Sequence, residues 1–333
     1  MNVELKDFQE AALDDLLKKV ERARRDAADA ELQAVVLSSP TGSGKTIILT
    51  ALMESIVFGG EGTDPDPGAV FVWISDSPEL NVQSRDKIVS ASRFKPSQLV
   101  IVEPPFSQEK FESGKIYFLN TQKLGRESLL TKTGDGRDFT IWETMQNTAS
   151  AKPGSFFLIL DEAHRGMTES PRAREQAVTI VQRFIKGEKA VGLSAVPLII
   201  GMSATPERFA KVSAGGARTK REAVISPEAV RASGLLKDRI VLYHPDVKQP
   251  SDWSMLAAAA ERWREYGASW KAYCEREGLQ AVSPVLVVQV EDGDEKIVTR
   301  TDLMTAVDVL EKELGPFSEG ALAHCFQEDK DLN

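Results

Sequence analysis

A glycine-rich segment at residues 39–46 stands between a short apolar run and a helical pattern that begins at Lys45. Glycine adopts backbone conformations closed to other residues, so the N–H groups around Gly42 and Gly44 can point together at phosphate oxygens. In such loops the lysine reaches the β- and γ-phosphates, the next hydroxyl binds magnesium, and the helix dipole adds positive charge. The pattern predicts a nucleoside triphosphate site with Mg²⁺, formed by Ser39, Thr41, Gly42, Ser43, Gly44, Lys45 and Thr46.

Two adjacent carboxylates, Asp161 and Glu162, follow the apolar run 156–160. Attack of water on the terminal phosphorus needs one group that holds magnesium and another that orients and deprotonates the water. We expect Asp161 to hold the metal and Glu162 to act on the water, while His164 passes the nucleotide state to a nucleic-acid site. Acidic residues after a strand often only cap the next helix. The pair therefore indicates a catalytic role only together with the phosphate loop earlier in the chain.

Short apolar runs alternate with helical patterns over the first two thirds of the chain. This alternation predicts an α/β fold, a parallel sheet with helices on both faces, in which ligands bind at the carboxyl ends of the strands. Each motif falls at such an end. The expected strands are 34–38, 70–74, 98–102, 115–119, 156–160 and 199–202, and the expected helices are 4–30, one from Lys45, 79–92 and 172–186.

The pattern changes after residue 245, where two proline-containing breaks precede a long helical pattern over 253–277. A valine-rich run at 285–290 then reads as a new strand, followed by a helix at 301–314. We expect three parts: a first α/β domain over 1–245, a helical linker over 246–280 and an incomplete second α/β domain over 281–333. The long helix carries Trp263, Tyr266, Trp270 and Tyr273 at helical spacing, which favours packing over stacking on nucleic-acid bases.

Charge and cysteine content narrow the class of protein. The 333 residues carry 50 acidic and 41 basic side chains, a net charge of −9, which argues against a histone-like DNA coat but leaves room for a local basic track. Cys274 and Cys325 lie far apart, which fits a reducing cytoplasm better than a disulfide framework. The chain shows neither a signal peptide nor an apolar run long enough for a membrane span. We expect a cytoplasmic protein without a membrane partner.

These motifs resemble those of the superfamily-two helicases of the DEAD/DEAH type. Residues 161–164 read Asp-Glu-Ala-His, as in the DEAH box, and residues 203–205 read Ser-Ala-Thr, which matches the family's motif III. Gln9, after Phe8, is similar to the glutamine that reads the adenine edge, although a polar residue on a helix face is nearly as good an interpretation. The resemblance implies RecA-like domains, ATP and Mg²⁺ as ligands, and coupling of ATP turnover to nucleic-acid movement through Ser203, Ala204 and Thr205.

Two polar segments after predicted strands resemble nucleic-acid contacts of the same family. Thr121 and Gln122 follow Asn120 in a segment similar to motif Ib, and residues 75–77 stand where motif Ia would be. Plain polar loops are an equal alternative for both. A basic stretch with Lys211, Arg218, Lys220 and Arg221 could also contact phosphates. A solvated loop is the favoured interpretation of that stretch.

A narrower resemblance runs through residues 205–209, 226–241 and 284–290, which are similar to the motor region of type III restriction enzyme Res subunits. It implies duplex DNA as the track, a separate methylation or specificity subunit as partner, and a role in restriction or phage defence. An RNA helicase and a module that binds nucleotide and nucleic acid without hydrolysis are the alternatives.

The chain departs from the helicase pattern in its last third. The second RecA-like domain of such motors normally supplies an arginine finger from a Gln-x-x-Gly-Arg-x-x-Arg motif. Beyond residue 280 the sequence has one arginine, Arg300, without that motif. We expect only part of the second RecA-like domain to be present, and an ATP hydrolase that turns over slowly by itself.

Overall fold

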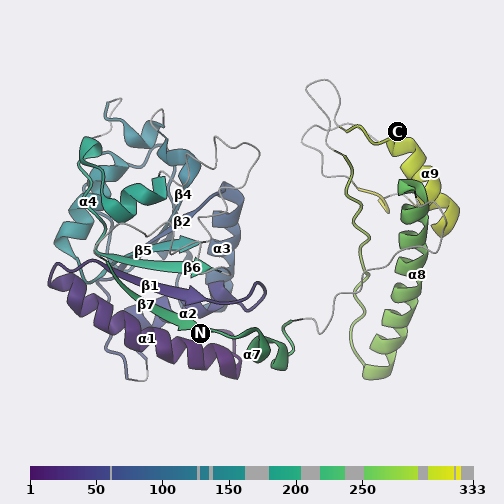
Figure 1. Ribbon diagram of the computed structural model, residues 1–333, viewed down its shortest axis with the longest axis horizontal. Helices are drawn as coiled ribbons and strands as arrows, with labels where there is room; N and C mark the ends of the chain where they lie inside the picture. The colour runs from purple at the N-terminus through teal and green to yellow at the C-terminus, as the bar shows by residue number, and fades with distance from the viewer. Residues whose placement is uncertain are drawn as a thin grey trace. The chain divides into compact units, whose positions relative to one another are not determined.

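A computed structural model describes residues 1–60, 62–125, 128–134, 138–161, 180–203, 218–236, 251–291, 299–318 and 320–323. The chain divides into two compact units, Met1–Asp238 and Arg239–Asn333. Figure 1 shows both units coloured along the chain. The domain boundaries at 245 and 280 stay predictions, since the division by contacts falls between Asp238 and Arg239.

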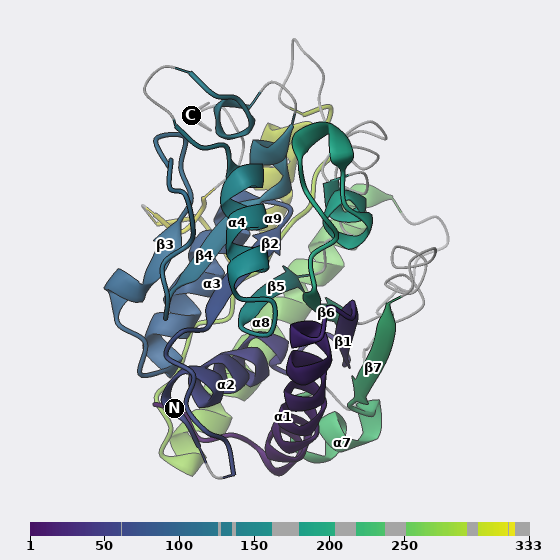
Figure 2. The same cartoon turned by 90° about the vertical axis from the view of Figure 1, so that its left-hand side faces the viewer.

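The first unit is built on a seven-stranded parallel sheet with the strand order β3-β4-β2-β5-β6-β1-β7. Figure 2 shows this order from β3 on the left to β7 on the right. The arrangement is α/β and RecA-like, as predicted. The strands are β1 (Gln33–Ser38), β2 (Val70–Ser75), β3 (Leu99–Ile101), β4 (Ile116–Asn120), β5 (Phe156–Asp161), β6 (Leu198–Ser203) and β7 (Thr219–Val224).

Helices cover both faces of this sheet, as expected where the strands are apolar on both sides. Figure 1 shows α1 and α2 on one side of the sheet and α4 on the other. The helices of the first unit are α1 (Asp7–Ala28), α2 (Lys45–Phe58), α3 (Pro78–Ala91), α4 (Ile141–Ala151) and α7 (Pro227–Ala232), with short 3₁₀ turns η1 (Pro96–Gln98), η2 (Thr121–Leu124), η3 (Leu129–Thr131) and η5 (Lys189–Val191).

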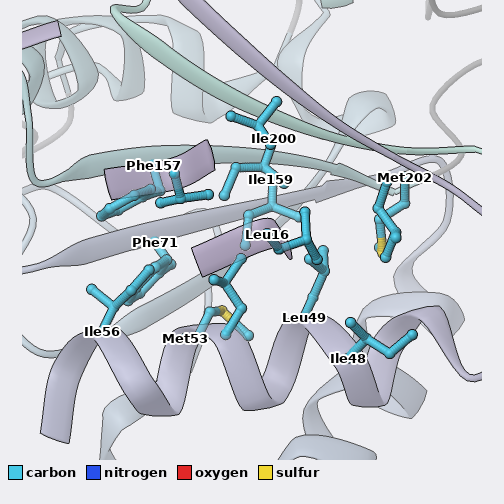
Figure 3. Close-up of a cluster of buried hydrophobic side chains, with 14 of the residues drawn as sticks. Leu16, Ile48, Leu49, Met53, Ile56, Phe71, Phe157, Ile159, Ile200 and Met202 are labelled. Carbon is cyan, nitrogen blue, oxygen red and sulfur yellow. The ribbon is translucent and has the colours of Figure 1, made fainter. Parts of the chain in front are cut away.

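The core that positions the sheet against α2 is visible in Figure 3. Ile48, Leu49, Met53 and Ile56 of α2 point at the strands and are almost fully buried. Phe71 and Phe157, on neighbouring strands, stack with ring centroids 4.8 Å apart. Each fully buried side chain of this size contributes about 1.5–3 kcal/mol through the hydrophobic effect. The helix that begins at Lys45 is therefore firmly anchored. On the strand side the same core includes Ile159, Ile200 and Met202.

The six strands expected from the sequence are present, each within one residue of its predicted ends. The seventh, β7, was not predicted, because Lys220, Arg221 and Glu222 interrupt its apolar pattern. It is an edge strand in which Ala223 alone is fully buried. Helix α4 was also missed. The Thr140–Glu143 capping box, in which each residue bonds the other's backbone N–H, marks its start.

Two residues of the basic stretch, Arg218 and Arg221, are structural, so the interpretation of the stretch as a solvated loop is wrong for them. Arg218 donates hydrogen bonds to the carbonyl oxygens of Gln33 (2.9 Å), Val196 (2.8 Å) and Ile185 (2.9 Å). Arg221 bonds Asp26 on α1 at 2.5 Å. Both guanidinium groups form hydrogen bonds within the protein, so they are not available to bind DNA phosphates. Lys211 lies outside the described residues.

The second unit contains α8 (Asp252–Glu277) and α9 (Leu303–Leu314), which pack on each other. The strand predicted at 285–290 is wrong, because the described residues there pair with no neighbouring strand. Instead the preceding residues lie along α8, where the indole N–H groups of Trp263 and Trp270 donate to the carbonyls of Pro284 (3.2 Å) and Val282 (3.1 Å). In the part of the chain that the structure describes, no helix combines the length and apolar character needed to cross a bilayer.

Candidate nucleotide-binding site

The phosphate loop and Asp161 leave the sheet at the same edge, on either side of β6. Ser38, the last residue of β1, is level with Ser203, and Asp161, the last residue of β5, is level with Met202. Adjacent strands lie about 4.8 Å apart, so β1 and β5 are roughly 10 Å apart with one strand between them. A magnesium–triphosphate group can span this separation. The two segments that the sequence assigns to one site are therefore brought to one place.

The loop at 39–46 has the backbone that phosphate binding requires. Gly42 (φ 87°) and Gly44 (φ 81°) both adopt left-handed conformations, and Gly44 is the N-cap of α2. The first N–H groups of a helix have no acceptor within it, so this end of α2 can donate to an anion. Lys45 folds back into the loop, where its Nζ donates to the carbonyls of Ser39 (3.2 Å) and Pro40 (3.3 Å). A lysine in this position can exchange those carbonyls for phosphate oxygens.

Gln9 braces the loop from α1. Its side chain is 6% exposed, its Nε2 donates to the carbonyl of Ser43 at 2.9 Å, and its Oε1 accepts from the N–H of Lys6 at 3.0 Å. The amide thus links the first turn of α1 to the phosphate loop. Both of its ends are engaged within the protein, and the adenine contact expected from the sequence stays a prediction.

Ser203, the first residue of the predicted coupling motif, is attached to the root of the loop. It ends β6 and is fully buried, and its carbonyl oxygen accepts a hydrogen bond from the N–H of Ser39 at 3.1 Å. A displacement of this strand end therefore reaches the phosphate loop directly. The remaining motif residues, Glu162, His164, Ala204 and Thr205, lie outside the described residues.

Polar side chains also gather at the ends of β2 and β4, which are neighbours in the sheet. Ser75 is level with Asn120, and its Oγ lies 2.7 Å from Oδ1 of Asn81 at the start of α3. Asn120 caps η2 by accepting from the N–H of Lys123 at 3.1 Å. These serine and asparagine side chains are buried. Their hydrogen bonds order the loops at this edge of the sheet, as polar side chains in loops often do.

The two residues predicted to contact DNA differ in exposure. Thr121 is only 3% exposed, whereas Gln122 is exposed. Of the pair, Gln122 alone offers its side chain to a ligand, and contact with DNA stays a prediction for both. Burial of the first residue could not be read from the sequence, because both are polar and both follow a strand.

The side chains at the site fit a magnesium–triphosphate ligand. The loop offers an ammonium group, a helix amino end and the Thr46 hydroxyl, and Asp161 offers a carboxylate. Among the described residues no three His, Cys, Asp or Glu side chains gather into a metal site. Magnesium bound mainly through phosphate oxygens and water needs only one or two protein oxygens. When bound, it neutralises charge on the phosphates.

The sheet carries the phosphate loop at the end of β1 and Asp161 at the end of β5, with β6 between them, and this arrangement is RecA-like. The chain belongs to the family described as "Type III restriction enzyme, res subunit", whose pattern matches residues 2–208. This match confirms the resemblance noted in the sequence.

Of three solved structures that the chain is similar to, two are described as helicases and one as a DEAD box protein. The helicase domain of Hef from Pyrococcus furiosus is 17% identical (TM-score 0.36), with 90% of this chain and 53% of that chain covered. UvsW from bacteriophage T4 is 14% identical (TM-score 0.31), with 60% and 59% covered. A DEAD box protein from Methanococcus jannaschii is 17% identical (TM-score 0.36), with 66% and 55% covered. The chain thus spans little more than half the length of each. No curated protein matches it.

Proposed function

We propose that the chain binds ATP with Mg²⁺ at this edge of the sheet and hydrolyses it to drive movement along duplex DNA. The observation that carries the proposal is the placement of the phosphate loop and Asp161 on either side of β6. Lys45 binds the β- and γ-phosphates, Thr46 and Asp161 hold the metal, and Glu162 orients the attacking water. Family membership supports a restriction or phage-defence setting, with a methylation or specificity subunit as partner.

Ser203, Ala204 and Thr205 are proposed to carry the state of the nucleotide to the nucleic acid. The hydrogen bond from the Ser39 N–H to the Ser203 carbonyl supports this, because it joins the two motifs without an intermediate residue. Gln122 is the proposed contact to the DNA backbone, since its exposed side chain follows the end of β4. His164 is the proposed link between the acidic pair and that contact.

Equilibrium binding of a fluorescent ATP and steady-state phosphate release test the proposal. The wild-type chain is expected to bind ATP with Mg²⁺, and Lys45→Ala to weaken binding by about two orders of magnitude, because a charge-assisted contact to phosphate is lost. Asp161→Asn is expected to abolish the Mg²⁺ dependence of ATP binding. Lys87→Ala, at an exposed lysine on α3, is the matched control. Equal ATP affinity in wild type and Lys45→Ala would contradict the proposed site.

The nucleic-acid track is tested by adding duplex DNA, single-stranded DNA or RNA to the phosphate-release assay. Stimulation by duplex DNA supports the translocase. Stimulation by RNA alone favours the RNA-helicase alternative. Tight ATP binding with no turnover on any nucleic acid favours a non-hydrolysing binding module.

A further inference from the structure

Residues 225–236, named here the bracket, run beside the phosphate loop. At the root of the loop, the N–H of Ile225 donates to the carbonyl of Ser38 at 2.8 Å. The short helix α7 follows, capped by the Ser226 side chain, which accepts from the N–H of Ala229 at 3.2 Å. Val230 on this helix is fully buried in the core of the first unit. The start and the middle of the bracket are therefore fixed.

The end of the bracket returns to the tip of the loop. Gly234, with φ 78°, reverses the chain after α7. One methyl carbon of Leu236, Cδ2, lies 3.4 Å from the place that a β-carbon on Gly42 would occupy. Leu236 is half-buried, whereas its neighbour Leu235 is 44% exposed. The first unit ends at Asp238, so Leu236 is two residues from the end of that unit in the sequence.

The side chain of Leu236 approaches the loop at a glycine. Gly42 holds a φ of 87°, which is accessible to glycine and rare for other residues, so this peptide can rearrange at little steric cost. Phosphate oxygens bound by the loop amides fix the peptides on either side of Gly42. A ligand shifts a conformational equilibrium by its differential affinity for the two states. A loop fixed by phosphate holds Gly42, which Leu236 approaches, in one position, and an unfixed loop does not.

We propose that Leu236 is a positioning residue, which docks on the phosphate loop in its nucleotide-bound form and thereby couples nucleotide binding to the order of the bracket. The inference rests on the proposed ATP site but adds a residue outside every motif of that site. Coupling of this kind is reciprocal, so the factor by which ATP orders the bracket equals the factor by which docking of Leu236 tightens ATP binding.

Amide hydrogen exchange in the full chain measures the coupling. The N–H groups of Ser233 and Gly234 bond the carbonyls of Ala229 (3.2 Å) and Arg231 (3.0 Å), so their exchange reports opening of the bracket. We expect β,γ-imido ATP with Mg²⁺ to slow their exchange about fivefold or more. AMP, which lacks the β- and γ-phosphates, is expected to have no such effect.

Leu236→Ala is expected to abolish the slowing and to weaken binding of β,γ-imido ATP by a similar factor. Leu236→Met, which keeps an apolar side chain of similar volume, is expected to restore both. Leu235→Ala is the matched control and should behave as wild type, because that side chain is 44% exposed, whereas Leu236 is half-buried against the loop. Thermal unfolding of the variants separates the coupling from a general loss of stability, which would lower protection throughout the first unit.

Two results would overturn the inference: nucleotide binding to wild type without slower exchange at Ser233 and Gly234, or unchanged slowing in Leu236→Ala at saturating nucleotide. A wild-type chain that fails to bind β,γ-imido ATP at all would instead refute the proposed ATP site, and the coupling with it. Direct binding measurements distinguish these cases.

Discussion

The side-chain nitrogen of Gln9 occupies the space that a β-carbon on Gly44 would need, since the two would be 2.6 Å apart. Gly44 also has a φ of 81°. Two features therefore disfavour a side chain at position 44: the left-handed backbone conformation and the steric clash with Gln9. Because of this close fit, a change at Gln9 on α1 and a change at Gly44 before α2 are expected to affect each other.

Gly44→Ala is expected to weaken ATP binding at least tenfold and to lower the free energy of unfolding by about 2 kcal/mol, through left-handed strain and the clash with Gln9. Gln9→Ala in the same chain removes the clash but not the strain. The double variant should therefore lose less stability than the sum of the two single variants. Gly62→Ala is the control for strain alone, because nothing lies within 4 Å of a β-carbon there. Strict additivity would show that the two residues do not interact.

Arg218→Met is expected to lower the free energy of unfolding by about 3 kcal/mol, because buried carbonyls at the amino ends of β1 and β6 lose their charged donor. Burial lowers the pKa of Arg218 to about 10, so the group remains charged at neutral pH. Urea unfolding of the full chain measures the change. Lys220→Met, two residues further along the chain on β7, is the control, since that lysine is exposed and pairs with Glu222 at 3.3 Å. Equal effects of both variants would contradict the structural role of Arg218.

Glu54 on α2 predicts a dependence of stability on pH. Burial alone would raise the pKa of its carboxyl, but hydrogen bonds from the N-terminal amine and from Arg93 outweigh burial and hold the pKa below 4.5. The charged form is thus favoured by folding. Its stabilisation is present above pH 4.5 and is lost as the pH falls through the lower pKa of the folded state.

Glu54→Gln is expected to lower stability at neutral pH and to flatten the fall of the unfolding midpoint between about pH 5 and pH 3. Thermal unfolding across this range measures the slope. Glu10→Gln, on the exposed face of α1, is the matched control. A variant at position 54 with the same acid slope as wild type would contradict the assignment.

Ala30 follows α1 in a left-handed conformation, with φ 67°. Glycine adopts this conformation without the steric penalty that a β-carbon carries. Ala30→Gly is therefore expected to raise the free energy of unfolding by about 0.5–1 kcal/mol. Ala11→Gly, at an exposed position inside the same helix, should lower it by about 1 kcal/mol. Two changes of the same sign in urea unfolding would contradict this reasoning.

The sequence predicts the central strands well, because apolar runs such as 70–74 are short, rich in valine and aromatic residues, and buried on both faces of the sheet. It fails where tertiary contacts decide. Thr219–Val224 pairs with β1 despite its charges, since Arg218 and Arg221 find partners far along the chain. The valines at 285–290 have strand propensity but no strand beside them in the described part of the second unit.

Gln9 shows the same limit within the site. Its place before the phosphate loop suggested contact with a base, whereas its hydrogen bond to Ser43 depends on how α1 packs against α2. Asn81 was not singled out, because a buried asparagine cannot be distinguished from an exposed one by its neighbours in sequence. Leu236 could be found only from the fold, since it is far along the chain from Gly42.

β7 has a practical consequence for anyone who expresses part of this protein. The matched family region ends at residue 208, yet β1 acquires its outer neighbour only at Thr219–Val224. A fragment that ends at residue 208 would leave β1 as an edge strand with unpaired backbone groups. Strands of other chains can pair with such an edge. The smallest well-behaved fragment of the first unit therefore has to extend past Val224, and a shorter one should precipitate or self-associate.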